Sequence, residues 1–260
     1  MNIIVLVKQV PNTTNMKVDP LHGTLIRSGV DTIINPDDLA SIELALQVKD
    51  NIQDTHIRVI TMGPAQAKNM LVDLYGYGVD DCVLLSDSAF AGADTWATSY
   101  TLAKAIERYP YDLIIAGRQA IDGDTAQVGP QVAQHCNIPQ ITYVSKLQEI
   151  TKQNITVVKS YEDYDELLAC NFPCLITALS DKTTLRDASF TMVWHADKKN
   201  ITTLTNKEIQ GDPHNIGLKG SLTQVKKTFV KTVEKKGQMI SNDVDLAAKK
   251  IAQILKDATH

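Results

Sequence analysis

Residues 1–180 alternate between short apolar runs and segments with helical spacing, and this alternation restricts the possible folds more than any other feature. The runs carry apolar side chains at successive positions, so both faces of each strand must be buried. Parallel strands covered by helices on both sides meet that requirement. The runs are Ile3–Val10, His56–Thr61, Cys82–Leu85 and Leu113–Ala116, and helical patterns begin at Pro36 (with Asn35 as N-cap), Gly63, Asp94 and Gln127.

The alternation therefore predicts an α/β fold, with a mostly parallel sheet and helices on both faces, in the Rossmann-like arrangement of nucleotide-binding proteins. Ligands of such sheets bind at the carboxyl ends of the strands. A ligand site is expected among the segments that follow the strands. These are Lys8–Pro11, Met62–Pro64, Ser86–Thr98 and Gly117–Pro130.

The pattern changes after residue 140. Further strands are predicted, followed by a polar, irregular segment at 181–200 and turns at 211–220. We assign residues 1–221 to the α/β domain. Residues 222–260 form a C-terminal arm, lysine-rich at first and ending in an amphipathic helix capped by Asn242; it either packs on another subunit or folds back on its own domain. The later strands are Ile141–Tyr143, Ile155–Tyr161, Leu167–Phe172 and Leu175–Leu179.

Charge and composition exclude several classes of protein. The net charge of −4 gives no electrostatic footprint for nucleic acid or for an anionic membrane. No apolar run approaches the ~20 residues that span a bilayer, and the N-terminal run lacks the basic flank and cleavage site of a signal peptide. We therefore expect a cytoplasmic protein without membrane insertion. The four cysteines lack the spacing of a metal site and are expected to be free thiols.

Two segments have the composition of a phosphate site. Gly117–Pro130 follows a buried strand and precedes a helix, so its glycines and backbone N–H groups can approach an anion at the helix N-terminus. The alternative is an ordinary glycine-rich connection. In Gly92–Thr98, capping of a helix explains Asp94 or Thr95. Capping does not explain Thr98, which lies one turn later on the same face and could reach a ligand.

These segments carry a resemblance to the β (small) subunit of electron-transfer flavoproteins. The match covers most of residues 1–180 and resumes near residue 215, and its longest motif is GRQAIDGDTAQVGPQVA at Gly117–Ala133. Shorter matches are VKQVPNT (Val7–Thr13), INPDDLASIELAL (Ile34–Leu46), MGPAQAKNML (Met62–Leu71), GADTWATSYTLAKAI (Gly92–Ile106) and GLKGSLTQV (Gly217–Val225).

The family has two branches. Ordinary members hold a structural AMP in this subunit, whereas electron-bifurcating members hold a second FAD in the same pocket. The sequences of Asp122–Pro130 and Asp94–Thr98 resemble those of the bifurcating branch. The physical reason is that a whole FAD needs contacts beyond its AMP half, which a second helix N-terminus can supply.

The resemblance implies a role for each matched residue. Leu6, Asn35, Asp38 and Met62 should surround the adenosine, and Asp94, Thr95 and Thr98 should lie near the diphosphate and flavin end. The remaining residues should wrap adenine, ribose and phosphate: Gln119, Asp122, Gly123, Asp124, Thr125, Ala126, Gln127, Val128, Gly129 and Pro130.

The resemblance also implies a reaction and a set of partners. NADH delivers a hydride to the FAD of this subunit. One electron passes to ferredoxin or flavodoxin, and the other passes through FAD on the large α subunit to a flavoprotein dehydrogenase. The flavin performs the redox chemistry, so the chain is an enzyme only as part of the complex. A GxGxxG fingerprint is absent, which counts against a separate NAD site in the chain.

The chain departs from the family pattern at its partner-recognition loop, near 181–200. Arg186 is kept, but Trp194 and His195 stand where the family has Met and Lys. Phe190 takes the place of the apolar residue that docks into the dehydrogenase. We therefore expect a 2-hydroxyacid dehydrogenase, such as a lactate dehydrogenase, as the partner, and an acyl-CoA dehydrogenase second. The rival hypotheses are a non-bifurcating subunit with AMP and a stress-protein-like regulatory module that binds ATP.

Overall fold

The computed structural model describes residues 1–12, 17–18, 25–26, 31–224 and 243–258. The chain divides into two compact units, Met1–Lys226 and Lys227–His260, which are treated separately. All four cysteines are free thiols, and Cys82 and Cys174 are buried.

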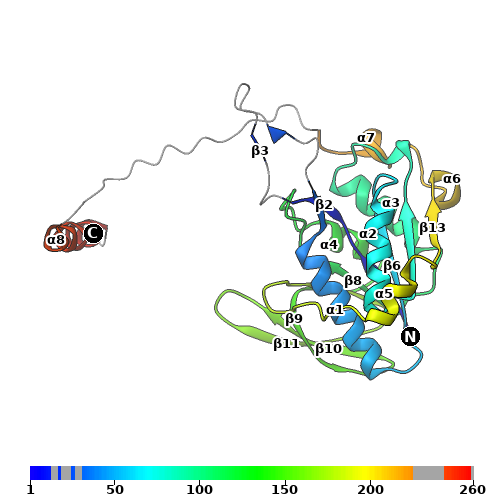
Figure 1. Cartoon of the computed structure of the whole chain (residues 1–260), viewed down its shortest axis with the longest axis horizontal. Helices are drawn as coiled ribbons and strands as arrows, with labels where there is room; N and C mark the ends of the chain where they lie inside the picture. Colours follow the sequence, from blue (N-terminus) through cyan, green and yellow to red (C-terminus); the bar gives the residue numbers. More distant parts are fainter. Residues whose placement is uncertain (13–16, 19–24, 27–30, 225–242, 259–260) are drawn as a thin grey trace. The chain divides into compact units, whose positions relative to one another are not determined.

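A nine-stranded sheet forms the centre of the first unit (Figure 1). Its strand order is β11-β10-β9-β12-β8-β1-β6-β7-β13, and every pair from β9 to β13 in that order is parallel. Only the β9–β10 and β10–β11 pairs are antiparallel. The α/β fold with a mostly parallel sheet is confirmed. The central strands are β1 (Asn2–Leu6), β6 (His56–Met62), β7 (Asp81–Leu85), β8 (Leu113–Gly117) and β12 (Cys174–Ala178).

Helices cover both faces of this sheet, which explains why the central strands carry apolar side chains at successive positions. Along β1, Ile3 and Val5 pack in one buried cluster, while Ile4 and Leu6 pack in another. The first cluster includes side chains of α1 (Pro36–Asn51) and α2 (Ala67–Leu74). The second includes side chains of α3 (Thr95–Ile106) and α4 (Val128–His135). The helix that was predicted to begin at Gly63 is α2, which begins at Ala67.

The predicted continuous strand Ile3–Val10 was wrong, because the chain leaves the large sheet after Leu6. Gln9–Pro11 forms a separate strand, β2, paired antiparallel with β5 (Thr32–Ile34). Between the two strands, the backbone N–H of Lys8 donates to the carboxylate of Asp38 at 2.7 Å. The strand is therefore interrupted at the carboxyl end of β1. A further two-stranded pair joins β3 (Lys17–Val18) and β4 (Leu25–Ile26).

The region after residue 140 is more regular than predicted. The polar stretch after Tyr143 belongs to β9 (Gln140–Ile150), which continues into the antiparallel strands β10 (Asn154–Ser160) and β11 (Asp165–Asn171). The segment predicted to be irregular at 181–200 contains a helix, α5 (Phe190–Ala196). An edge strand that the sequence analysis missed, β13 (Ile201–Leu204), pairs with β7.

Short helices complete the first unit. They are α6 (Asn206–Ile209), α7 (Gly217–Gly220) and the 3₁₀ turns η2 (Tyr75–Tyr77) and η3 (Ser88–Phe90).

The second unit contains α8 (Val244–Ala258). The predicted cap, Asn242, lies outside the described residues; within them, the Asp243 carboxylate accepts from the Leu246 N–H at 2.9 Å. Apolar side chains of α8 are exposed, among them Ile251, Ile254 and Leu255. Among the described residues, no helix has the length and apolar character needed to cross a membrane.

Candidate functional site

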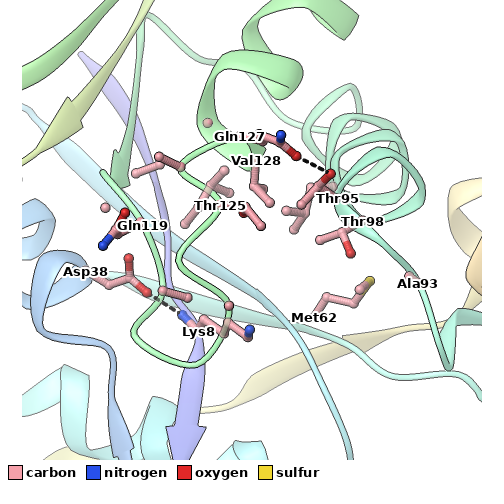
Figure 2. Close-up of a pocket in the computed structure, with 18 of the residues that line it drawn as sticks. Lys8, Asp38, Met62, Ala93, Thr95, Thr98, Gln119, Thr125, Gln127 and Val128 are labelled. Carbon is pink, nitrogen blue, oxygen red and sulfur yellow. Dashed lines mark hydrogen bonds between the residues drawn. The ribbon is translucent and has the colours of Figure 1, made fainter. Parts of the chain in front are cut away.

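The order of the strands locates a crevice between β1 and β8. From β1 the chain proceeds to β6 and β7 on one side and then returns to β8 on the other side. Loops after β1 and β8 consequently diverge, and the gap at their carboxyl ends is the usual ligand site of an open α/β sheet. A cavity of about 410 Å³ lies at this point (Figure 2).

Most of the predicted binding residues line this cavity. Four of them do not: Asn35, Asp122, Asp124 and Pro130. Residues from the ends of three strands and from three helices, α1, α3 and α4, thus meet in one place, although they are far apart in the sequence. The predicted residues that line it are Leu6, Asp38, Met62, Asp94, Thr95, Thr98, Gln119, Gly123, Thr125, Ala126, Gln127, Val128 and Gly129.

Asn35 holds the loop that forms one wall of the cavity. It occupies the N-cap position of α1, but its side chain makes no capping hydrogen bond. Its amide instead donates to the Gln119 carbonyl at 2.8 Å and accepts from the Ile121 N–H at 3.1 Å. Asn35 therefore fixes the start of the loop after β8.

The middle of the same loop has an unusual backbone. Asp124 and Ala126 both have positive φ values, of 49° and 52°. Such values are uncommon for residues other than glycine and concentrate at functional sites. The Asp124 carboxylate accepts from the Gln119 side chain at 3.1 Å, which braces the loop from within. Pro130 lies in the first turn of α4, where its missing N–H leaves no helical bond unmade.

Lys8 is a lining residue that the sequence analysis missed as a binding residue. Its ammonium donates to both carboxylate oxygens of Asp122, at 2.7 and 2.8 Å. This ion pair joins the segment after β1 to the loop after β8 across the crevice. The pair is half-exposed, so its contribution to stability is small, on the order of 0–1 kcal/mol. Lys8 could have been predicted as a binding residue from its place at the carboxyl end of β1.

Two acidic side chains at the start of α1, Asp37 and Asp38, lie against the beginning of the loop after β8. Asp37 accepts from the Ser180 hydroxyl at 2.6 Å and pairs with the Arg118 guanidinium at 3.2 Å. Asp38 is 6% exposed and lines the cavity. A Cβ atom on Gly117 would collide with the Asp38 carboxylate, so glycine permits this close approach. Burial raises the pKa of Asp38 to about 7, although hydrogen bonds from Asn35 and Lys8 act in the opposite direction.

This raised pKa predicts a pH-dependent stability. Between pH 3.8 and about 7 the unfolded chain loses the proton of Asp38 while the folded chain keeps it, so the free energy of unfolding should fall as the pH rises. The fall should amount to roughly 2–4 kcal/mol and should level off above that window. Denaturant titrations of the nucleotide-free chain across this range measure it. The Asp38→Asn variant should show a flatter profile, and equal slopes would contradict the assignment.

The N-termini of α3 and α4 meet at the cavity. Asp94 caps α3, because its carboxylate accepts from the Ala97 N–H at 3.0 Å. Burial tends to raise the pKa of Asp94, but hydrogen bonds from Ala97 and Thr223 outweigh it and lower that pKa below its usual range. The Thr95 hydroxyl donates to the Gln127 side chain at 2.8 Å and so links the two helices. The N–H groups of a helix's first turn and the helix dipole favour an anion at such a position.

Thr98 lies next to this junction and turns toward the cavity (Figure 2). Several further lining residues were not predicted as binding residues. Phe90 and Leu102 add apolar surface, whereas Arg118 adds positive charge, as Lys8 does. Phe90 and Arg118 lie in the predicted segments Ser86–Thr98 and Gly117–Pro130, whereas Leu102 lies about two turns into α3 and had no such signal. The other unpredicted lining residues are Val7, Gly92, Ala93, Ala116, Gly117 and Ala120.

A separate surface is formed by α5. Phe190 is 81% exposed and Trp194 is 70% exposed, and their rings stack with centroids 6.3 Å apart. The inner side of α5 packs closely on η2, where a Cβ atom on Gly76 would meet the Val193 side chain. Arg186 anchors the preceding loop through ion pairs with Glu43 at 3.0 Å and Asp50 at 2.8 Å. Thus α5 is held from beneath while its aromatic side chains face outward.

The fold and the cavity define an α/β protein with a candidate ligand site at the carboxyl ends of its strands, beside the N-termini of α3 and α4. The model of the electron transfer flavoprotein domain matches residues 22–208. The chain belongs to the electron transfer flavoprotein family, on the side of its beta subunits. The family is associated with flavin, and its beta subunits pair with an alpha subunit.

Relatives match along nearly the whole chain. The electron transfer flavoprotein subunit beta of Clostridium acetobutylicum is 47% identical over 99% of this chain and 98% of its own length. The caffeyl-CoA reductase-Etf complex subunit CarD of Acetobacterium woodii is 44% identical, with coverage of 93% and 92%. Protein FixA of Azotobacter vinelandii is 40% identical, with coverage of 94% and 90%.

Proposed function

We propose that this chain is the cytoplasmic beta subunit of an electron-bifurcating flavoprotein and that it holds FAD in the crevice between β1 and β8. The observation that carries the proposal is the meeting of two helix N-termini at one cavity, with Thr95 and Thr98 beside them. One helix N-terminus suffices for the single phosphate of AMP. A second one, with hydroxyl groups, matches the diphosphate and ribityl chain of FAD.

The size and lining of the site also favour FAD over AMP. Its walls combine apolar side chains such as Met62 and Phe90 with the cations Lys8 and Arg118. A second hollow of about 380 Å³ shares Met62 and Phe90 with the cavity. A ligand longer than a mononucleotide therefore has room to continue along the strand ends. Both volumes lie within the range of about 300–1,000 Å³ typical of ligand pockets.

The chain contributes binding and electrostatics, and the bound group contributes the redox chemistry. The chemistry that FAD would supply at this site is acceptance of a hydride from NADH and release of its two electrons singly, one to ferredoxin or flavodoxin and the other to FAD on the alpha subunit. The N-termini of α3 and α4 would hold the diphosphate, and Lys8 and Arg118 would add positive charge beside it. Asn35 and Asp122 act indirectly, since they hold the loop after β8 in place.

Anaerobic titration of the purified heterodimer with NADH tests this function. We expect NADH to bleach the absorbance of a flavin in the wild-type heterodimer. This NADH-reducible flavin should be missing when the cavity of this subunit is blocked. If the blocked heterodimer kept all of its NADH-reducible flavin, the proposal would be refuted. The regulatory ATP-binding module is set aside, because the chain belongs to a flavoprotein family.

For the dehydrogenase partner, we propose docking on the aromatic side of α5. Phe190 and Trp194 are large, exposed and held on a rigid helix, which is typical of binding anchors. The residues around Phe190 differ from the family pattern, so a 2-hydroxyacid dehydrogenase is our first choice. The second choice is an acyl-CoA dehydrogenase. It is retained because the name of the CarD relative includes caffeyl-CoA reductase.

For the alpha subunit, we propose the apolar side of α8 as a docking surface. This side of α8 exposes three large apolar side chains, Leu246, Ile251 and Ile254. Burying each of them is worth about 1.5–3 kcal/mol. Deleting residues 240–260 should therefore weaken association with the alpha subunit at least tenfold, while the first unit keeps its unfolding transition. Analytical ultracentrifugation of the heterodimer measures the effect. Unchanged association after the deletion would overturn this proposal.

A further inference from the structure

The segment Gly217–Thr223, which includes α7, lies against the start of α3. The Leu218 N–H donates to the Ala91 carbonyl at 2.9 Å. The Ser221 hydroxyl is placed between three groups: it accepts from the Asp94 N–H at 2.9 Å and lies 3.2 Å from the Gly92 carbonyl and 2.9 Å from that of Gly217. The segment is thus fastened to the residues that begin α3.

Two glycines allow this close packing. Gly92 has a φ of +74°, and a Cβ atom on it would lie 3.2 Å from the Cβ of Leu218. Gly217 has a φ of +56°, and a Cβ atom there would collide with the Ala89 carbonyl. Other residues rarely adopt these conformations. The backbone of both segments is therefore shaped for contact with each other.

Asp94 connects this contact to the cavity. One oxygen of its carboxylate, Oδ1, accepts from the Ala97 N–H and caps α3. The other, Oδ2, accepts from the Thr223 N–H at 2.9 Å and from the Thr223 hydroxyl at 3.0 Å. Asp94 also lines the cavity, together with Gly92, Ala93 and Thr95. Loss of the Thr223 bonds would free the side chain that orients the N–H groups of the helix N-terminus.

We propose that Ser221 and Thr223 are positioning residues of the nucleotide site, and that nucleotide binding is coupled to the docking of Gly217–Thr223 on the start of α3. The inference rests on the proposed function, because it takes the N-terminus of α3 as the diphosphate site. A ligand that favours the capped geometry also favours the Thr223 bonds that maintain it. By linkage, the docked segment strengthens nucleotide binding by the same factor.

Variants of the full-length chain in its heterodimer test the coupling. Thr223→Val keeps the shape of the side chain but removes its hydroxyl, and Thr223→Ser restores the hydroxyl. FAD affinity should fall about fivefold or more in Thr223→Val, the lower end of the range for coupled sites, and should recover in Thr223→Ser. Thr151→Val is the matched control. It removes a similar hydroxyl bond, to Asn154, in the β9–β10 turn, and FAD affinity should stay unchanged.

Hydrogen exchange supplies a second readout that a merely structural role would not move. In the wild-type heterodimer, FAD should slow exchange of the Thr223 backbone amide, and this slowing should shrink in Thr223→Val. Unchanged exchange on FAD binding, or wild-type affinity in Thr223→Val, would overturn the coupling and leave the proposed FAD site standing. A wild-type heterodimer that holds no FAD in this subunit would overturn both.

Discussion

Replacing Thr98 with tryptophan is expected to leave the subunit without FAD. Thr98 is half-buried on the side of α3 that faces the cavity, so a larger side chain extends into the cavity and away from the core. An indole there would occupy space that the ligand needs in a cavity of about 410 Å³. Cofactor analysis of the purified heterodimer should find the flavin of this subunit missing, while the melting temperature of the complex stripped of nucleotide changes little.

The matched variant is Thr98→Val, which keeps the shape and removes only the hydroxyl. It should retain FAD with a modest loss of affinity, since one hydrogen bond is worth about 0.5–1.5 kcal/mol. NADH-dependent reduction of the flavin should change in this variant even though its stability does not. If Thr98→Trp retained a full complement of flavin, the cavity would not be the FAD site.

The second large effect is expected at Phe190. Its side chain is 81% exposed, so Phe190→Ala should hardly change the stability of the subunit. If the ring is the central anchor for the dehydrogenase, its loss should cost about 2 kcal/mol or more, which is roughly 30-fold in affinity. Electron delivery to the dehydrogenase, measured by stopped-flow spectroscopy, should slow accordingly, while NADH still reduces the flavin in this subunit.

Leu167→Ala provides the control for Phe190. Leu167 is another exposed apolar residue, on β11, and its truncation should leave delivery to the dehydrogenase unchanged. Equal losses in both variants would indicate a general surface effect. Abolished flavin reduction or an unfolded subunit in Phe190→Ala would instead place Phe190 in the site or the core.

The sequence allowed the central sheet to be predicted, because burial on both faces leaves a local trace in the residue pattern. Runs such as Leu113–Ala116 are apolar at every position, which few other environments permit. The edges of the sheet were harder. β9 is half exposed and mixes polar residues with Val144, Leu147 and Ile150 beyond Tyr143, and β13 is a strand of four residues. Neither has a pattern strong enough to distinguish it from a loop.

In the candidate site, too, some features could be predicted from the local sequence and others could not. Residues that end a strand or begin a helix, such as Met62 and Thr95, could be predicted because topology brings strand ends together. The partners of each side chain could not. Asn35 has the sequence of a helix cap, yet its amide bonds to the loop after β8. The Lys8–Asp122 pair joins residues 114 positions apart, and no local pattern records such a contact.

The proposal that this subunit holds FAD is tested most directly by the flavin content of the purified heterodimer of this chain with its alpha subunit. Denaturing the complex and quantifying the released cofactors by chromatography gives the ratio of FAD to protein and detects any AMP. We expect two FAD per heterodimer and no AMP, with one FAD lost in the Thr98→Trp variant. One FAD and one AMP per heterodimer would contradict this expectation and would identify the cavity as the structural AMP site of a non-bifurcating flavoprotein.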